Sequence, residues 1–310
     1  MGRHKELILF GLMCLIWGAT WIAAKEGVTA VPVGLFAATR FTAAGLLLSG
    51  WLLVRREKIA VARADWPRLI GVTLMMVCAC YALLFWGMKY VNSGTSALVD
   101  LSLTPVFLLG FSVLHGEERF DRRRALAIAL GVAGLAVLFG PKALAGSSRH
   151  AMELVGGAAI VVSAAIYSWG SVLARPLLRA YPSTLMAALT TLVGGIVLLI
   201  GSVAFEPGAR AALNGHWGLG AWLGWAFLVL FGSLVGYVVY MRLLHSWGAS
   251  RAGAYAFVSP VVAVPLGMVW YGEKVGPADL VAMVMMLTAA GLAIQSTAPK
   301  PAEPIAEGPA

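Results

Sequence analysis

The sequence predicts an all-α integral membrane protein of ten transmembrane helices, arranged as two inverted five-helix repeats. The first observation is the composition, because 60% of the 310 residues are hydrophobic and only 12% are charged, whereas a soluble protein carries roughly 25% charged residues. The second is that the apolar residues form long blocks, and a helix needs about 20 of them to cross the hydrocarbon core. The third is an internal repeat, described below.

Ten apolar blocks are the predicted membrane spans. In chain order they are residues 7–24, 32–54, 69–88, 93–114, 125–139, 154–174, 181–205, 219–241, 252–271 and 280–294. The first block follows a basic start, as a signal peptide would, but it is longer than most signal cores and has a counterpart later in the chain. We therefore interpret it as a span. Residues 295–310 are rich in Pro and Ala without an apolar period, and we expect a disordered tail there.

The positions of Lys and Arg predict the orientation. With the N-terminus in the cytoplasm, sixteen of the 23 Lys and Arg residues lie on the cytoplasmic side, six lie outside, and Arg40 lies within a span. Such a bias places both termini in the cytoplasm, here of a bacterial inner membrane. Cysteine labelling at Ala310 should therefore succeed only after the cells are permeabilised, and labelling of intact cells would contradict the ten-span interpretation.

The net charge of +9 could suggest nucleic acid, but the basic residues sit in short segments between apolar blocks. We therefore expect the partners to be the lipid bilayer and a small-molecule substrate, with no nucleic acid. The three cysteines lie within apolar blocks, and Cys78 and Cys80 point to different faces of one helix. No metal site or cofactor is expected. The sequence is compatible with both a monomer and a homodimer.

The two halves of the chain carry similar residues in the same order and at nearly the same spacing. Four pairs are 150 residues apart: Trp17 and Tyr167, Lys25 and Arg175, Pro32 and Pro182, Gly45 and Gly195. Two further pairs are 155 apart: Pro105 and Pro260, Glu118 and Glu273. This predicts a first repeat at residues 1–140, a linker at 141–153 and a second repeat at 154–294. Because each repeat has an odd number of spans, the second enters the membrane inverted, as in many secondary transporters.

The same residues resemble a known family. Trp17-Gly18 with Lys25, Pro32, Arg40, and Pro105 with Gly116-Glu117-Glu118 resemble the repeat unit of EamA-type proteins of the drug/metabolite transporter superfamily, and Pro182, Pro260 and Gly272-Glu273 repeat part of it. The resemblance implies ten helices, a central cavity between the repeats, and movement of metabolites, often export. Within the superfamily the chain is most similar to YddG-like exporters of aromatic and neutral amino acids. It departs from the pattern at Thr190, the counterpart of Arg40.

Two charges lie well inside spans. Arg40 is eight residues past Pro32 and Asp100 is seven past Ser93, which puts both about 11–12 Å deep at 1.5 Å per residue. Charges at such depth pair with one another or face a wet cavity. A structural Arg40–Asp100 salt bridge, contact with a substrate or a coupling ion, and an Arg40 bound only to helix-end carbonyls are the alternatives.

Aromatic side chains are the second candidate for substrate binding. Trp17 and Trp21 are four residues apart on one span, as are Tyr81 and Phe85 on another, so each pair shares a helix face. Mid-membrane indole and phenol groups need partners that lipid cannot supply, so they either join helices or line a cavity. The remaining candidates are Tyr167, Trp169 and Tyr237. Tyr167 and Trp169 are two apart and cannot share a face; symmetry with Trp17 favours the former, and the larger indole favours the latter.

Pro105 and Pro260 lie inside spans, where each removes a backbone hydrogen bond and favours a kink. They are candidate hinges for gating, with a passive kink as the alternative. No catalytic constellation or phosphate-binding loop falls within the spans, so no enzymatic activity is expected. The predicted function is export of small amphipathic metabolites, most plausibly aromatic or neutral amino acids, by alternating access. A broader drug or sugar-type substrate and a non-transporting membrane scaffold are the alternatives.

Overall fold

The computed structural model describes residues 3–57, 59–116, 121–144, 148–247 and 255–296, which are helical without any β-strand. The α-helices are α1 (Arg3–Ala30), α2 (Val33–Val54), α3 (Trp66–Thr73), α4 (Cys80–Met88), α5 (Ser93–Leu114), α6 (Arg122–Leu144), α7 (Ser148–Ala180), α8 (Ser183–Phe205), α9 (Ala209–Ala212), α10 (Leu219–Phe227), α11 (Gly236–Trp247), α13 (Tyr255–Tyr271) and α14 (Pro277–Ser296). A short 3₁₀ turn, η1 (Arg63–Asp65), precedes α3, and the π-helical segments η2 (Leu74–Ala79) and η3 (Leu228–Val235) join α3 to α4 and α10 to α11.

Eight helical stretches within the described residues are long and apolar enough to cross a membrane. They are Lys5–Ala30, Val33–Val54, Arg63–Met88, Ser93–Leu114, Arg122–Pro141, His150–Ala180, Ser183–Phe205 and Leu219–Tyr240. Two shorter apolar helices, Tyr255–Tyr271 and Pro277–Leu292, follow. The chain is thus an all-helical, multi-pass membrane protein.

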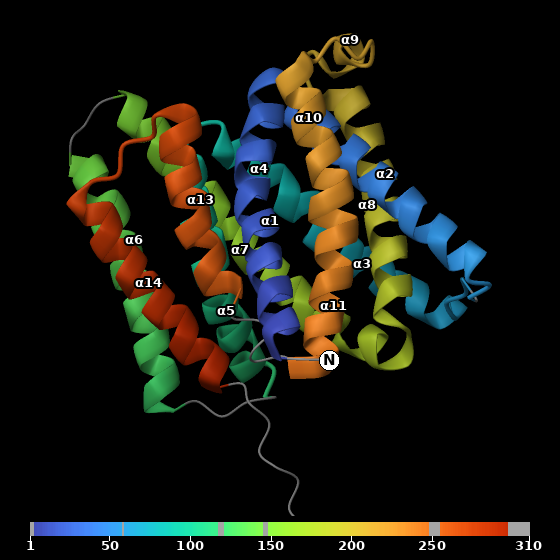
Figure 1. Ribbon diagram of the computed structural model, residues 1–310, viewed down its shortest axis with the longest axis horizontal. Coiled ribbons are helices and arrows are strands. Elements are labelled where there is room, and N and C mark those ends of the chain that lie inside the picture. Colours follow the sequence, from blue (N-terminus) through green and yellow to red (C-terminus); the bar gives the residue numbers. More distant parts are fainter. Residues whose placement is uncertain (1–2, 58, 117–120, 145–147, 248–254, 297–310) are drawn as a thin grey trace, which may run out of the picture.

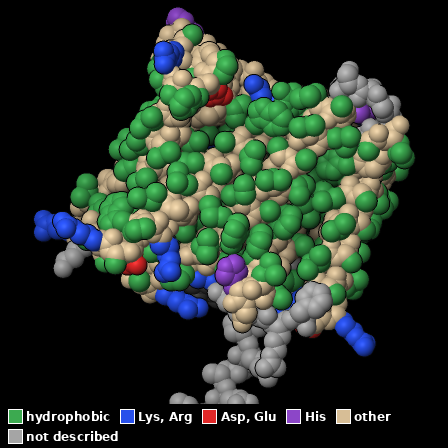
Figure 2. Space-filling model, turned by 180° about the vertical axis from the view of Figure 1, so that it is seen from behind, with side chains coloured by type: hydrophobic (Ala, Val, Ile, Leu, Met, Phe, Trp, Pro, Cys, Tyr) green, Lys and Arg blue, Asp and Glu red, His purple; other side chains and the backbone are tan. Residues whose placement is uncertain are grey.

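The outer surface of the bundle is suited to lipid. Large apolar side chains that point outward are more than half exposed, among them Leu46, Leu53, Ile200, Leu223 and Val269. Figure 2 shows hydrophobic side chains across the middle of one face, with Lys and Arg near its ends. A soluble monomer rarely exposes apolar patches larger than a few hundred Å², so this surface agrees with the spans identified from the helices.

The helices are arranged around α1, which packs against α10 and α11 on one side and α13 on the other (Figure 1). Helices α2 and α8 form one edge of the bundle, α6 and α14 form the opposite edge, and α5 packs against α7. The N-terminus lies at the end of the bundle opposite α9. We call this the N-terminal end, and the end that carries α9 the α9 end.

The close approach of α2 and α8 depends on two glycines, Gly45 and Gly195, which sequence analysis paired by their offset. A Cβ added at Gly45 would meet the backbone of Leu192, and one added at Gly195 would meet the backbone of Thr42. Small residues let membrane helices pack backbone against backbone. The two glycines therefore fix the distance at which α2 and α8 cross.

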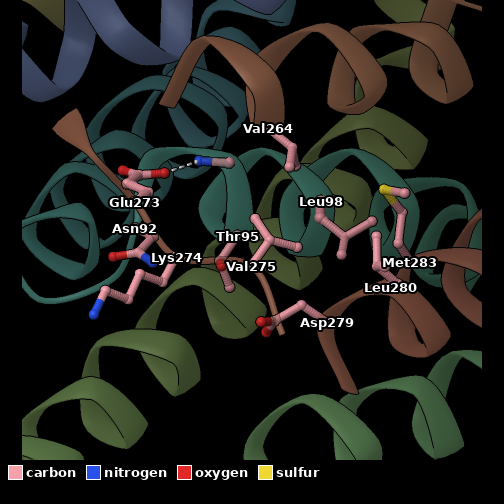
Figure 3. Close-up of a pocket in the computed structure, with 11 residues that line it drawn as sticks. Asn92, Thr95, Leu98, Val264, Glu273, Lys274, Val275, Asp279, Leu280 and Met283 are labelled. Atoms are coloured by element: carbon pink, nitrogen blue, oxygen red, sulfur yellow. Dashed lines mark hydrogen bonds between the residues drawn. The ribbon is translucent and has the colours of Figure 1, made fainter. Parts of the chain in front are cut away.

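Two carboxylates from the second half of the chain cap helices of the first half. Glu206 accepts hydrogen bonds from the backbone N–H groups of Gly34 (3.1 Å) and Leu35 (3.2 Å) at the start of α2. Glu273 accepts from the N–H groups of Ser93 (2.6 Å) and Gly94 (3.2 Å) at the start of α5; Figure 3 shows the second of these bonds. The first N–H groups of a helix have no partner within it, and a carboxylate also interacts favourably with the helix dipole there. Both caps lie at the α9 end.

The cap on α5 leads to a stability prediction. Because Glu273 also accepts from the Ser93 hydroxyl at 2.8 Å, Glu273→Gln loses charge-assisted hydrogen bonds worth roughly 1.5–3 kcal/mol each, partly replaced by the amide oxygen. We expect a lower melting temperature in detergent. Glu57→Gln, on the exposed turn after α2, is the matched control and should melt as the wild type does; an unchanged Glu273→Gln would contradict a stabilising cap.

The helices are longer than the apolar blocks predicted. Helix α6 continues to Leu144 and α7 begins at Ser148, so much of the predicted linker at 141–153 is helical. Helix α7 also runs past Arg175 to Ala180. Arg175 can remain in the helix because its guanidinium donates to the Ser112 hydroxyl at 2.8 Å. Charged side chains at span ends thus extend helices that a charge-free window cuts short.

Two π-helical segments occur at positions for which the sequence predicted no irregular backbone. Helices α5 and α13 run without interruption through Pro105 and Pro260. The departures from α-helical geometry are the π-helical segments η2 and η3, which begin at Leu74 and Leu228. Such segments are frequent at functional sites, and both lead into helices that carry cavity-lining side chains.

Candidate functional site

A cavity of about 530 Å³ lies among the helices near the centre of the bundle. This volume is within the usual range for small-molecule sites, about 300–1,000 Å³. Its lining residues are Trp17, Thr20, Trp21, Ala24, Arg40, Cys80, Tyr81, Leu84, Phe85, Met88, Asp100, Leu101, Thr104, Pro105, Leu108, Tyr167, Ser171, Leu228, Gly232, Tyr240, Tyr255 and Ala256. They come from α1, α2, α4, α5, α7, η3, α11 and α13.

The lining is unevenly placed along the bundle. Toward the N-terminal end it reaches Tyr255, the first residue of α13. Toward the α9 end it stops at Ala24 and Met88. There the Lys25 ammonium donates hydrogen bonds to the carbonyls of Met88 and Val91, the latter at 2.6 Å. These bonds tie α1 to the end of α4 next to the point where the lining ends.

A smaller cavity, shown in Figure 3, lies at the α9 end beside the Glu273 cap. Asn92, Thr95, Lys274 and Asp279 contribute polar groups to it. Its volume is about 20 Å³, and one water needs about 10–15 Å³ on this measure. It is therefore too small for a metabolite.

Arg40 enters the central cavity from α2 against three aromatic rings. Its guanidinium carbon lies 4.7 Å from the ring centroid of Phe41, 5.5 Å from that of Tyr81 and 5.8 Å from that of Phe85. Cation–π contacts of this length stabilise a cation modestly. The Arg40 Nε is buried and has no hydrogen-bond partner. The guanidinium is therefore held in place with hydrogen-bonding capacity left over.

Asp100 enters the same cavity from α5. Its backbone carbonyl accepts from the Thr104 hydroxyl at 2.7 Å, but none of the described residues donates a hydrogen bond to its carboxylate. Arg40 and Asp100 do not form an ion pair within 4.0 Å. The structural salt bridge considered from the sequence is thus absent from this conformation, and so is an Arg40 satisfied by helix-end carbonyls.

Three aromatic residues from different helices form a further part of the lining. The Trp17 ring centroid is 4.3 Å from that of Tyr255 and 5.5 Å from that of Tyr240, and the two tyrosine rings are 5.9 Å apart. The Trp17 indole N–H donates to the carbonyl of Gly232 in η3 at 3.3 Å. The indole is therefore fixed by π-helical backbone and presents its ring, rather than its N–H, to the cavity. We call Trp17, Tyr240 and Tyr255 the aromatic triad.

The structure brings most of the predicted site residues to one place. Those that line the cavity are Trp17, Trp21, Arg40, Tyr81, Phe85, Asp100, Tyr167 and the candidate hinge Pro105. Pro260 is buried within α13 outside the lining. The side chain of Tyr237 lies outside the described residues.

Trp169 does not line the cavity. It is 45% exposed, and its ring stacks on Phe111 with centroids 5.9 Å apart. Tyr167, two positions earlier, points inward instead, as the helical period requires once one of the two faces the bundle. Tyr240 and Tyr255 are not among the site residues predicted from the sequence. Tyr240 is three residues after the predicted Tyr237, a helical spacing that could have suggested it, but Tyr255 lies near a predicted span end, where an interfacial belt explains a tyrosine equally well.

The groups that line the cavity are suited to binding a ligand. The cavity presents one cation, one carboxylate and several aromatic faces, and among the described residues no group of three or more His, Cys, Asp or Glu side chains could hold a metal ion. Fold and cavity together define a multi-pass membrane protein with an internal cavity among its helices, an architecture found in transporters.

The chain belongs to the EamA-like transporter family. The family model matches it twice, at residues 4–140 and 154–295. An uncharacterized inner membrane transporter of Escherichia coli (strain K12), YedA, is 31% identical over 98% of this chain and 96% of its own length. An uncharacterized transporter of Bacillus subtilis (strain 168), YoaV, is 25% identical over 84% of this chain and 87% of its own.

A protein of known crystal structure shares the fold, with a TM-score of 0.63 and 21% sequence identity over 94% of this chain and 97% of that one. The family and its named members identify a membrane transporter rather than an enzyme.

Proposed function

We propose that this transporter exports zwitterionic amphipathic metabolites, foremost amino acids with aromatic or other neutral side chains, by alternating access through the central cavity. The observation that carries the proposal is a guanidinium and a carboxylate that line one cavity without pairing with each other. An amino acid supplies the complementary carboxylate and ammonium. Each charge of the cavity then gains a partner only when substrate is bound.

Each part of such a substrate has a matching surface. Arg40 lines the cavity without an ion pair to Asp100, and its guanidinium can hold a carboxylate through two parallel hydrogen bonds. The Asp100 carboxylate accepts from the ammonium. The aromatic triad offers ring faces to an apolar or aromatic side chain, and such contacts favour offset or edge-to-face geometry.

The membrane arrangement that supports alternating access is ten spans in two inverted repeats. In this proposal α13 and α14 cross the bilayer along with the eight longer stretches. Two features support the repeats: the family model matches each half of the chain, and the π-helical segments begin 154 residues apart, at Leu74 and Leu228. With both termini in the cytoplasm of a bacterial inner membrane, the cavity is closed toward the periplasm by the Lys25 bonds and extends toward the cytoplasm.

Counterflow in liposomes tests the proposal. Purified protein should exchange labelled L-phenylalanine across the membrane. Unlabelled phenethylamine, which lacks the carboxylate, and 3-phenylpropionate, which lacks the ammonium, should compete at least about tenfold less well, because each leaves one buried charge unpaired. Equal competition by either analogue would contradict the two-charge site. Absence of flux for every solute offered would favour the scaffold alternative.

The proposal assigns Pro105 and Pro260 to gating. Replacing both with alanine restores a backbone hydrogen bond in α5 and in α13. We expect a folded double variant whose exchange rate is severalfold lower, because the exchange between conformations is slowed. Pro265→Ala, in α13 but exposed, is the control. Full-rate exchange by the double variant would show that the two prolines are passive.

A further inference from the structure

Asp100 is the one carboxylic acid among the described residues that line the central cavity. Its carboxylate receives no hydrogen bond or ion pair from them. An ionised carboxylate without a partner is costly in the interior of a membrane protein. Either a bound cation or a proton removes that cost, so the empty and the loaded cavity need different ways to neutralise the same side chain.

The other charged and titratable groups that face this cavity are a guanidinium, a thiol and phenols. They are Arg40 of α2, Cys80 and Tyr81 of α4, Tyr167 of α7, Tyr240 of α11 and Tyr255 of α13. A guanidinium stays charged, and thiols and phenols ordinarily ionise near pH 8.5 and pH 10, respectively. The thiol and the phenols are therefore neutral at pH 7, and the carboxylate of Asp100 is the negative charge of this set that a proton can remove.

The other helices packed against α5 add no competing charge at this depth. The charged side chains described on α6 and α14 lie in their first turns, at Arg122–Arg124 and Asp279. On α7, Glu153 and Arg179 lie toward the two ends of the helix, and Arg175 donates to Ser112, twelve residues beyond Asp100 on α5. Lys25 of α1 is engaged with the carbonyls of Met88 and Val91. A proton on Asp100 is thus the simplest way to neutralise the empty cavity.

We infer that Asp100 binds either a proton or the ammonium of the substrate, never both, so that the protein exchanges one inward-moving proton for each exported zwitterion. The inference rests on the proposed function and adds the coupling ion to it. Facing the cytoplasm, substrate binding breaks the O–H bond of Asp100, and the proton leaves to water in the cavity. Facing outward, the substrate departs and the carboxylate takes a proton from external water. One proton enters the cell and one amino acid leaves it.

Proton release on binding tests this step without any need for transport. L-Phenylalanine added to purified protein in weakly buffered detergent solution should release up to one proton per molecule bound, read with a pH-sensitive dye. Binding is measured independently by the change in tryptophan fluorescence, to which the cavity-lining Trp17 and Trp21 contribute. In the wild type the Kd for L-phenylalanine should rise as the pH is lowered, because proton and substrate compete for Asp100. The rise should reach up to tenfold per pH unit once Asp100 is mostly protonated.

Amino-acid substitutions test whether Asp100, rather than another acidic residue, releases the proton. Asp100→Asn should stay folded, since it breaks no ion pair, and should show neither proton release nor pH-dependent affinity in whatever binding it retains. Asp100→Glu restores the carboxyl group and should restore proton release. Asp121→Asn, at the start of α6 outside the cavity, should behave as the wild type does. Proton release that persists in Asp100→Asn would overturn the assignment.

Transport of L-phenylalanine into proteoliposomes provides a second test of the coupling. Proteoliposomes with an acidic lumen should accumulate external L-phenylalanine above equilibrium, and nigericin, which collapses the pH gradient, should release it. Counterflow that proceeds normally, with no proton release and no gradient-driven accumulation, would overturn the coupling while leaving the proposed function intact. No binding and no counterflow of any amino acid would overturn both.

Discussion

Replacing Arg40 with glutamine should weaken the binding of L-phenylalanine at least about 100-fold while the protein stays folded. The substrate carboxylate would lose two charge-assisted hydrogen bonds, each worth roughly 1.5–3 kcal/mol, and a loss of about 2.7 kcal/mol already corresponds to 100-fold in Kd. The fold should tolerate the change because Arg40 makes ring contacts but no ion pair in the cavity, and its Nε is unpartnered. Fluorescence titration and a thermal melt measure the two effects.

Arg40→Lys is a second variant to compare, because lysine keeps the positive charge but cannot form two parallel hydrogen bonds. Its affinity for L-phenylalanine should lie between those of the wild type and Arg40→Gln. Arg55→Gln is the matched control on the same helix, since Arg55 lies over Trp51 at the end of α2. It should bind normally. Wild-type affinity in Arg40→Gln would place the carboxylate elsewhere, whereas a variant that fails to fold would show that the ring contacts of Arg40 are structural.

The apolar helices, eight of them long enough to cross a membrane, could be predicted because their signal is local: an apolar stretch of sufficient length must lie in lipid or in the core wherever it occurs. The ends of the helices were less predictable, because they depend on partners elsewhere. Arg175 continues α7 through its contact with Ser112, 63 residues earlier in the chain. No charge-free window contains that information.

The π-helical segments show what a local pattern omits. A π-segment leaves carbonyls without their usual helical partners, and here Gly232 in η3 accepts from Trp17, 215 residues away. Proline has a visible backbone signature, so Pro105 and Pro260 were the irregularities that the sequence suggested. The π-helical backbone at Gly232 has no such signature, because the side chain that satisfies it is distant in the sequence.

The candidate site was partly predictable for the same reason. Arg40 and Asp100 stand out because a charge in mid-membrane is costly wherever it points. The choice between Tyr167 and Trp169 depends on the rotation of α7, which packing decides. The role of Glu273 needed the fold as well, because its motif is readable but the helix it caps begins 180 residues earlier.

Substituting Gly45 is expected to have the largest effect on stability. A Cβ at this position would lie 2.5 Å from the backbone nitrogen of Leu192 and 2.6 Å from its Cα. Because these are backbone atoms of α8, no side-chain rotation can relieve the contact, and α2 would have to move away from α8. Overpacking of this kind costs roughly 1–3 kcal/mol, and sometimes more.

Gly45→Ala should therefore lower the melting temperature markedly, and Gly45→Leu should prevent recovery of monodisperse protein. Gly50 provides a control on the same helix, because a Cβ there would meet nothing within 4 Å; Gly50→Ala should melt at or slightly above the wild-type temperature, since alanine favours a helix. Any folded Gly45→Ala should also bind L-phenylalanine less well, because Arg40 lies little more than one turn away on α2 and would shift with it. A Gly45→Ala variant that melts and binds as the wild type does would show that α2 and α8 can separate without disturbing the cavity.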